Sequence, residues 1–132
     1  MKIHPFLSPR NLVAIAIMLV LTPFIFVADL LAEIYHRTCF PLYGIKCISR
    51  RKYIQIDRHK LKYLNVFEKI GCVYCGYVNG LVNYWVAGAA ASEAYWCGIR
   101  HKRTKGFIPP AHHKKFLKYG DKKGWQKFLR KK

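Results

Sequence analysis

A single long apolar segment near the start of the chain constrains its fold more than any other feature. Leu12 to Ala28 form a run of seventeen residues without a charge, and the apolar helical character continues to Tyr35. At ~1.5 Å per helical residue the uncharged run covers ~25 Å, and the extension covers the ~30 Å hydrocarbon core of a bilayer. Ser8 and Pro9 mark the helix start, since Ser caps helices and Pro is tolerated in their first turn. We therefore predict one transmembrane helix.

A cleaved signal peptide is the competing interpretation of this segment, because Lys2 and Arg10 give it a basic start. The apolar run exceeds the roughly 7 to 15 residues usual in signal peptides, and no small-x-small cleavage site follows it, so we favour an uncleaved anchor. Basic residues close to a span set its orientation. More of them follow the segment than precede it, namely Arg37, Lys46, Arg50, Arg51 and Lys52. We predict a single-pass membrane protein, with its N-terminus outside and its C-terminus in the cytoplasm.

Four metal-binding side chains follow the apolar segment in the pattern C-x2-C-x21-C-x3-H, namely Cys72, Cys75, Cys97 and His101. A CxxC pair directs two thiolates at one ion, and the CxxxH spacing places a thiol and an imidazole one helical turn apart. Cys3His sets are typical of tetrahedral zinc, and related spacings hold iron-sulfur clusters. A reducing cytoplasm also favours metal binding over disulfides. The pattern predicts a metal centre, with zinc preferred over an iron-sulfur cluster.

The segment between the two ligand pairs decides whether they can share one ion. Its sequence predicts a helix over residues 76–96 with one broad apolar face. A straight helix from Asn79 to Cys97 would hold the pairs ~27 Å apart. One shared site therefore requires a break in the helix, and Gly80 and Gly88 are the candidate positions. Without a break, the two pairs belong to separate sites.

A catalytic site is the alternative if the pairs are separate. Glu93, Cys97 and His101 have the spacing i, i+4, i+8, which aligns them along one face of a helix. A thiol beside an imidazole that a carboxylate orients is an arrangement that activates a cysteine nucleophile. His112 and His113 are two further metal-binding residue types, but adjacent histidines in a basic segment are expected to be solvated. We retain this catalytic set as the second hypothesis.

The charge of the chain predicts an acidic partner. Lys and Arg number 24 against six acidic residues, which gives a net charge of +18. The last nineteen residues carry nine basic groups and a single acid, Asp121, with aromatic residues such as Trp125 and Phe128 interspersed. This mixture suits an interfacial segment on anionic lipid, where each basic residue contributes ~1 kcal/mol. Nucleic acid is the rival polyanion, but we favour lipid because the chain is already tethered to a bilayer.

Three stretches resemble a group of small bacterial membrane proteins. They are residues 61–68, 72–80 and 93–101, and their CxYCxYxNG and YWCxIxH elements are distinctive. In that group Pro is usual where Gly98 stands here, and Lys where Arg100 stands. The resemblance covers roughly the middle third of the chain. It implies that the four predicted ligands act as one set, and it implies no reaction.

These features predict a mainly α fold with one N-terminal transmembrane helix and a small helical domain that a metal can stabilise. We expect an anchor over residues 1–36, a basic juxtamembrane connector over 37–60, a Cys/His-containing helical domain over 61–105 and a basic interfacial tail over 106–132. The sequence has no nucleotide-binding glycine loop, Ser-His-Asp set or paired-carboxylate motif. We therefore predict an accessory or assembly subunit of a larger membrane protein or complex. The alternatives are a membrane-associated thiol or iron-sulfur redox enzyme and a membrane-tethered nucleic-acid binder.

Overall fold

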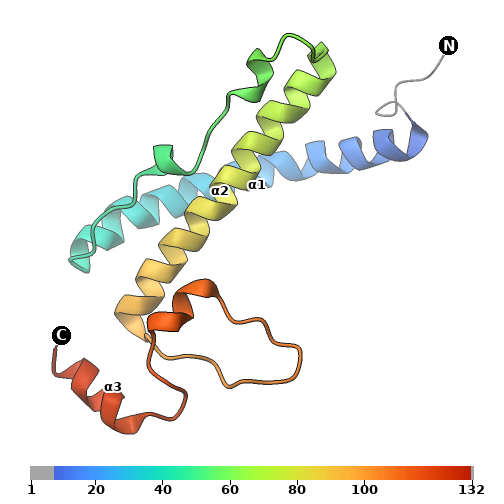
Figure 1. The fold of residues 1–132 in the computed structure, drawn as a ribbon. Coiled ribbons are helices and arrows are strands. Elements are labelled where there is room, and N and C mark those ends of the chain that lie inside the picture. The colour runs from blue at the N-terminus through green and yellow to red at the C-terminus, as the bar shows by residue number, and fades with distance from the viewer. Residues whose placement is uncertain (1–7, 132) are drawn as a thin grey trace. The chain divides into compact units, whose positions relative to one another are not determined.

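Helices dominate the chain in a computed structural model that describes residues 8–131 (Figure 1). In chain order the elements are α1 (Pro9–Leu42), η2 (Arg50–Lys52), η3 (Arg58–Lys60), α2 (Val66–Trp96), η4 (Ala111–Lys115) and α3 (Lys122–Leu129). Among the described residues the β-structure is limited to one isolated parallel bridge, between Ile99 and Leu117. Lys2, which entered the orientation argument, and Lys132 lie outside the described residues. The predicted mainly helical fold with a long apolar N-terminal helix is confirmed.

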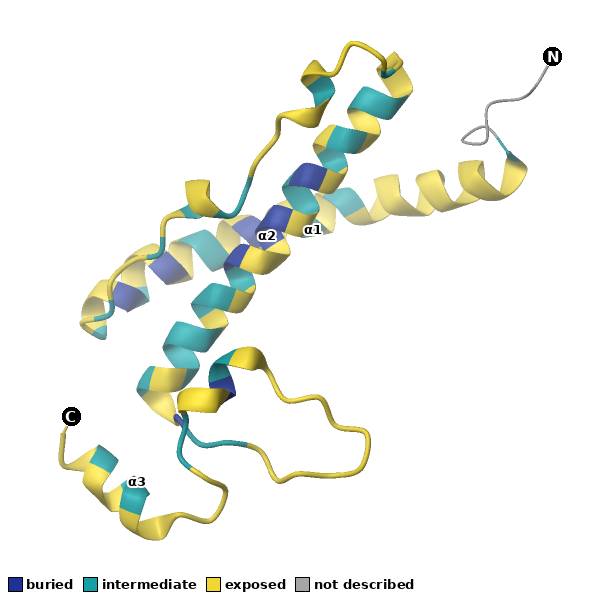
Figure 2. Cartoon of the chain, viewed as in Figure 1, coloured by how far each residue is buried: buried dark blue, intermediate teal, exposed yellow. Residues whose placement is uncertain are grey.

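The chain divides into two compact units, residues 1–39 and residues 40–132. The first unit consists mainly of α1, which begins at Pro9 as predicted, with the backbone oxygen of Ser8 accepting bonds from the amides of Asn11 and Leu12. The 34 residues of α1 extend ~51 Å, more than a bilayer core requires. None of its most apolar 18-residue window is buried, and Figure 2 shows the exposed surface along it. By length and composition α1 can cross a membrane.

The second unit is built around α2, whose start is fixed by a capping box. The side chain of Asn65 accepts a bond from the amide of Glu68 at 2.9 Å, and the Glu68 carboxylate accepts one from the amide of Asn65 at 2.8 Å. These two bonds satisfy amides that a helix start otherwise leaves unpaired. The helix then continues unbroken for 31 residues, or ~46 Å. The predicted helix over residues 76–96 is therefore the second part of a longer one.

The connector before α2 runs back along this helix and packs against two of its glycines (Figure 1). A Cβ atom built on Gly76 would lie 2.9 Å from the backbone oxygen of Gln55, and one on Gly80 would lie 2.6 Å from that of Tyr53. Only glycine permits so close an approach of two backbones. Beside this contact, the ring of Tyr84 is buried and lies 6.1 Å from the ring of Tyr53. Tyr53 itself ends η2, and no strand is assigned to residues 53–57, so this stretch is a connector.

The C-terminal residues form two short helical pieces, η4 and α3, with a turn at Gly120 between them. Gly124 lies inside α3. Asp121 caps α3 by accepting a bond from the amide of Gly124 at 2.9 Å. The rings of Trp125 and Phe128 stack on one side of this helix, with their centroids 5.3 Å apart. The side of α3 that carries these two rings is apolar, whereas its lysines lie on the other side.

Candidate functional site

The cysteine pairs lie at distant points of α2. Cys72 and Cys75 are in its first turns, and Cys97 is the residue that caps its C-terminal end. The helix has no break at Gly80 or Gly88, so Cys75 and Cys97 are separated by ~33 Å of continuous helix. One ion requires its donors within ~2.0 to 2.3 Å. The condition for a shared Cys3His centre is therefore not met, and the structure does not bring the two pairs together. None of the five cysteines forms a disulfide in the structure.

The alternative set of Glu93, Cys97 and His101 is also not aligned. The amides of Cys97 and Gly98 both donate to the backbone oxygen of Glu93, and Gly98 adopts a φ of 56°. This left-handed residue ends the helix, as glycine commonly does. His101 consequently lies in the following loop and not one turn further along the helical face. The Glu93 carboxylate is hydrogen-bonded to two other side chains.

Those two side chains are His112 and His113. Their Nε2 atoms lie 2.8 Å and 3.1 Å from the two carboxylate oxygens of Glu93. One donor atom from each of the three residues lies within 4.8 Å of the others, and no second group of this kind was found among residues 8–131. We call these three residues the Glu-His-His cluster. It joins residues that are 19 and 20 positions apart in the sequence.

The loop that delivers the histidines is closed by backbone hydrogen bonds. The amide of Leu117 donates to the oxygen of Gly98 at 2.8 Å, and the amide of Arg100 donates to the oxygen of Leu117 at 2.9 Å. These bonds bring the chain after η4 back to the end of α2. The Arg100 guanidinium also donates to the backbone oxygen of Lys114. Pro110 precedes η4 with a φ of −55°, which the pyrrolidine ring favours.

Aromatic rings enclose the inner histidine of the cluster. His113 is only 3% exposed, and its ring stacks on Phe116 with centroids 5.0 Å apart. The ring of His101 lies on it at 5.2 Å and a 38° tilt. His113 Nδ1 is buried and has no hydrogen-bond partner among the described residues. His112 and Glu93 are less buried, with 25% and 32% of their side chains exposed. The cluster therefore has a buried side and an accessible side.

The cluster stabilises the negative charge of Glu93. The pKa of the Glu93 carboxyl is lowered, mainly by the hydrogen bond from His112 and further by the charge and the hydrogen bond of His113. Partial burial of the carboxyl raises the pKa, but by less. An ionised carboxylate only accepts hydrogen bonds, so each histidine donates from Nε2 in this arrangement. Glu93 is thus an anionic acceptor in a strongly basic chain.

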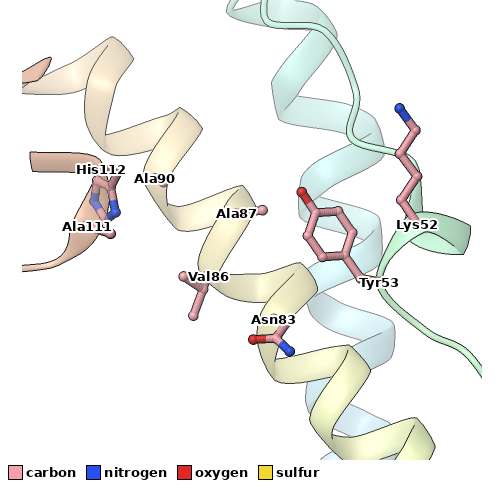
Figure 3. Close-up of a pocket in the computed structure, with 8 residues that line it drawn as sticks. All are labelled: Lys52, Tyr53, Asn83, Val86, Ala87, Ala90, Ala111 and His112. Carbon is pink, nitrogen blue, oxygen red and sulfur yellow. The ribbon is translucent and has the colours of Figure 1, made fainter. Parts of the chain in front are cut away.

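A shallow groove leads to the accessible side of the cluster. It has a volume of about 450 Å³, and His112 forms part of its wall (Figure 3). Small and medium side chains of α2 also line it, including Val86, Ala87 and Ala90, and Lys52 and Tyr53 from the connector lie beyond them. Because the groove is open, a water-sized or ion-sized species can reach His112 from solvent. The arrangement of the three side chains can hold a small cation between two imidazole nitrogens and a carboxylate.

Comparison with known proteins adds no assignment. No protein-family model matches the chain, and searches among curated proteins and solved structures return no match. The function is therefore inferred from the geometry and chemistry of the residues themselves.

The histidine pair was assigned to solvent in the sequence prediction because it lies in a basic segment. The preceding Pro109-Pro110 is a local signal for a turn, but it does not identify the partner of the pair. Glu93 is one of only six acidic residues in the chain. Its scarcity was the available signal that it pairs with a histidine or a basic side chain. The pairing itself depends on the closure of a long loop, which no local pattern predicts.

Proposed function

We propose that the protein is a single-pass membrane accessory subunit whose basic domain, residues 40–132, lies on the anionic cytoplasmic surface of the bacterial inner membrane. The observation that carries this proposal is the exposed apolar surface of α1. A helix that is strongly apolar over 18 residues, none of them buried by protein, requires another apolar environment. A bilayer supplies that environment, since a helix satisfies all its backbone hydrogen bonds internally.

The charge distribution supports the orientation and the lipid surface. Within the window that sets topology, more basic residues follow the apolar segment than precede it. The short helix α3 carries Lys122, Lys123 and Lys127 on one side and the stacked rings of Trp125 and Phe128 on the other. Basic residues beside aromatic rings favour the headgroup region of anionic membranes. Part of the apolar side of α3 faces its own domain, because Phe128 lies close to Gly98. Attraction between the lysines and the lipid headgroups therefore contributes more to membrane binding of α3 than insertion of its aromatic rings does.

The accessory role is supported by the sparse core of this domain. Its buried hydrophobic residues are Phe40, Leu81 and Tyr84. In the first turns of α2, by contrast, Val66, Phe67 and Ile70 are 69%, 75% and 63% exposed. Exposed apolar patches of this kind mark contact surfaces for lipid or for another protein. A domain with so few buried hydrophobic side chains is better suited to associating with a larger membrane complex than to maintaining a rigid catalytic cleft.

Hydrogen-deuterium exchange of the full chain in nanodiscs tests the lipid surface. We expect the amides of α3 to exchange more slowly in nanodiscs containing anionic lipid than in purely zwitterionic ones. The protection should decrease as salt rises from about 0.1 M to about 1 M, because the screening length falls from ~10 Å to ~3 Å. The variant Lys122→Gln, Lys123→Gln, Lys127→Gln should lose this protection in anionic nanodiscs. It is a matched variant, since these side chains are exposed and lie outside the Glu-His-His cluster.

Two results would count against the proposal. Equal exchange of α3 in anionic and zwitterionic nanodiscs would remove its lipid role. Protection that appears only when RNA is added, in either type of nanodisc, would favour the nucleic-acid alternative. The accessory role is tested separately by native electrophoresis of membranes solubilised in mild detergent, where the chain should migrate within a larger complex and not as a single chain.

A further inference from the structure

We infer that Glu93, His112 and His113 bind one divalent transition-metal ion, with zinc as the ion that fits them best, and that this ion fastens the loop of residues 98–117 to the end of α2. This site differs from the cysteine-based centre that the sequence predicted. It is independent of the proposed membrane function, since it rests on the geometry of the cluster.

The three donors already converge. In a tetrahedral zinc site with bonds of ~2.0 to 2.1 Å, neighbouring donor atoms are ~3.3 Å apart. Here the nitrogen of His112 lies 2.8 Å and that of His113 lies 3.1 Å from their respective Glu93 oxygens. For an ion to bind, these two separations must each increase by a few tenths of an ångström, and the histidine donors, which lie within 4.8 Å of each other, must come to ~3.3 Å. Rotation of the Glu93 side chain, which is partly exposed at the end of its helix, can provide part of this movement.

The donor types select the metal. Imidazole nitrogen suits zinc and other transition metals, whereas magnesium and calcium prefer sites made of oxygen donors. With one carboxylate in a chain of net charge +18, the cluster offers too little negative charge for those harder cations. Two histidines and a glutamate also match a known zinc ligand set that leaves one position for water. His101 contacts the ring of His113, but it is not among the three residues whose donors converge.

The burial of His113 is an independent observation for this site. Its side chain is 3% exposed, and Glu93 is its polar partner at Nε2, whereas Nδ1 has no partner among the described residues. Burial of a polar group is unfavourable unless its hydrogen-bonding or coordinating capacity is used. A metal ion held by Nε2 of both imidazoles and by the carboxylate would compensate for burying this imidazole, whereas Nδ1 is not one of the proposed donors. The groove beside His112 gives the ion an entry path.

The bound ion would act on the fold. Without it, Glu93 is joined to η4 by two hydrogen bonds, and the loop is otherwise closed by the backbone pairing of Gly98 and Arg100 with Leu117. An ion that ligates residues from α2 and η4 connects the two segments directly. Because such a site is formed only in the folded loop, metal binding and loop ordering are coupled.

Cobalt and zinc titration of the full chain in detergent micelles tests this inference. After removal of metal with a chelator, we expect the chain to bind one Co²⁺ with visible d-d absorption, but without the intense near-ultraviolet charge-transfer band of a thiolate-cobalt bond. Zn²⁺ should displace the Co²⁺. The variant Cys72→Ser, Cys75→Ser, Cys97→Ser should bind as the unmodified chain does.

Metal affinity is compared between variants of the Glu-His-His cluster and a control variant. Glu93→Gln and His112→Gln should each weaken binding by more than the ~10- to 100-fold that is typical of losing a hydrogen-bonded neighbour of a ligand. These two side chains are partly exposed, so their replacement should leave the helical content by circular dichroism unchanged, whereas replacement of the buried His113 can disturb the fold itself. His59→Gln is the matched control, since His59 lies in η3 and not in the cluster.

Three outcomes would overturn the inference. The first is the absence of saturable binding by the unmodified chain. The second is binding by folded Glu93→Gln and His112→Gln with unchanged affinity. The third is a thiolate-cobalt band that disappears in the triple serine variant, which would return the metal to the cysteines. Zinc should also slow hydrogen exchange in residues 98–117, and unchanged exchange in that loop would refute the fastening role.

Discussion

Replacement of Gly80 by Ala should destabilise the basic domain, whereas the same replacement at Gly88 should stabilise it. A Cβ on Gly80 would lie 2.6 Å from the oxygen of Tyr53 and 2.7 Å from the Cα of Ile54, whereas a Cβ on Gly88 would meet nothing within 4 Å. Both positions are inside α2, so each gains ~0.8 to 1 kcal/mol from the higher helix propensity of Ala. At Gly80 the backbone of the connector must move, and overpacking of this kind costs ~1 to 3 kcal/mol.

The two variants should therefore differ by the packing cost alone, ~1 to 3 kcal/mol, because the propensity gain is common to both. Urea unfolding of each full chain in mild detergent, followed by tryptophan fluorescence, measures this difference. Hydrogen exchange of residues 53–56 should be faster in Gly80→Ala and unchanged in Gly88→Ala. Equal unfolding free energies for the two variants would show that the connector does not pack on α2 at Gly80.

Two further predictions concern the ends of α2. Asn65→Ala removes the side chain of the capping box and should lower the unfolding free energy by ~1 kcal/mol, while hydrogen exchange becomes faster in the first turn of α2; exchange that stays unchanged there would argue against the cap. The lowered pKa of Glu93 stabilises the metal-free fold fully above its ordinary value of 4.5, and this contribution is lost as the pH falls through the lowered value. The stability difference between the unmodified chain and Glu93→Gln should therefore shrink below about pH 4.5, and a difference independent of pH would contradict this stabilisation of the Glu93 carboxylate.

The helices could be predicted where a local pattern decides them. The apolar run of α1 and its Ser8-Pro9 start were sufficient, because lipid-compatible helices are specified by composition and length. The start of α2 has an equally local signal, Asn65 followed three residues later by Glu68, which the sequence prediction did not use. The start of a helix is thus accessible to sequence reasoning even when its full length is not.

The glycines of α2 show why its length was not predicted. Gly80 reads as a possible helix break, since glycine lowers helix propensity. In the structure it is instead the point at which the connector backbone approaches α2, so tertiary packing outweighs the propensity. The same limitation applies to the candidate site. The spacing of the cysteines suggested one centre, whereas the contact between Glu93 and His112 spans 19 residues and depends on loop closure at Leu117.

Thiol accessibility tests the central claim, that α1 crosses the inner membrane and leaves residues 40–132 in the cytoplasm. Cys47, Cys75 and Cys97 are exposed and lie in that domain, so they serve as native probes for a membrane-impermeant maleimide. We predict no labelling in intact spheroplasts and full labelling after permeabilisation. Ser8→Cys, in a chain whose five native cysteines are replaced by Ser, should label in intact spheroplasts because this residue precedes α1. Labelling of the native cysteines in intact spheroplasts, with the thiol of the Ser8→Cys variant protected, would contradict the proposed orientation.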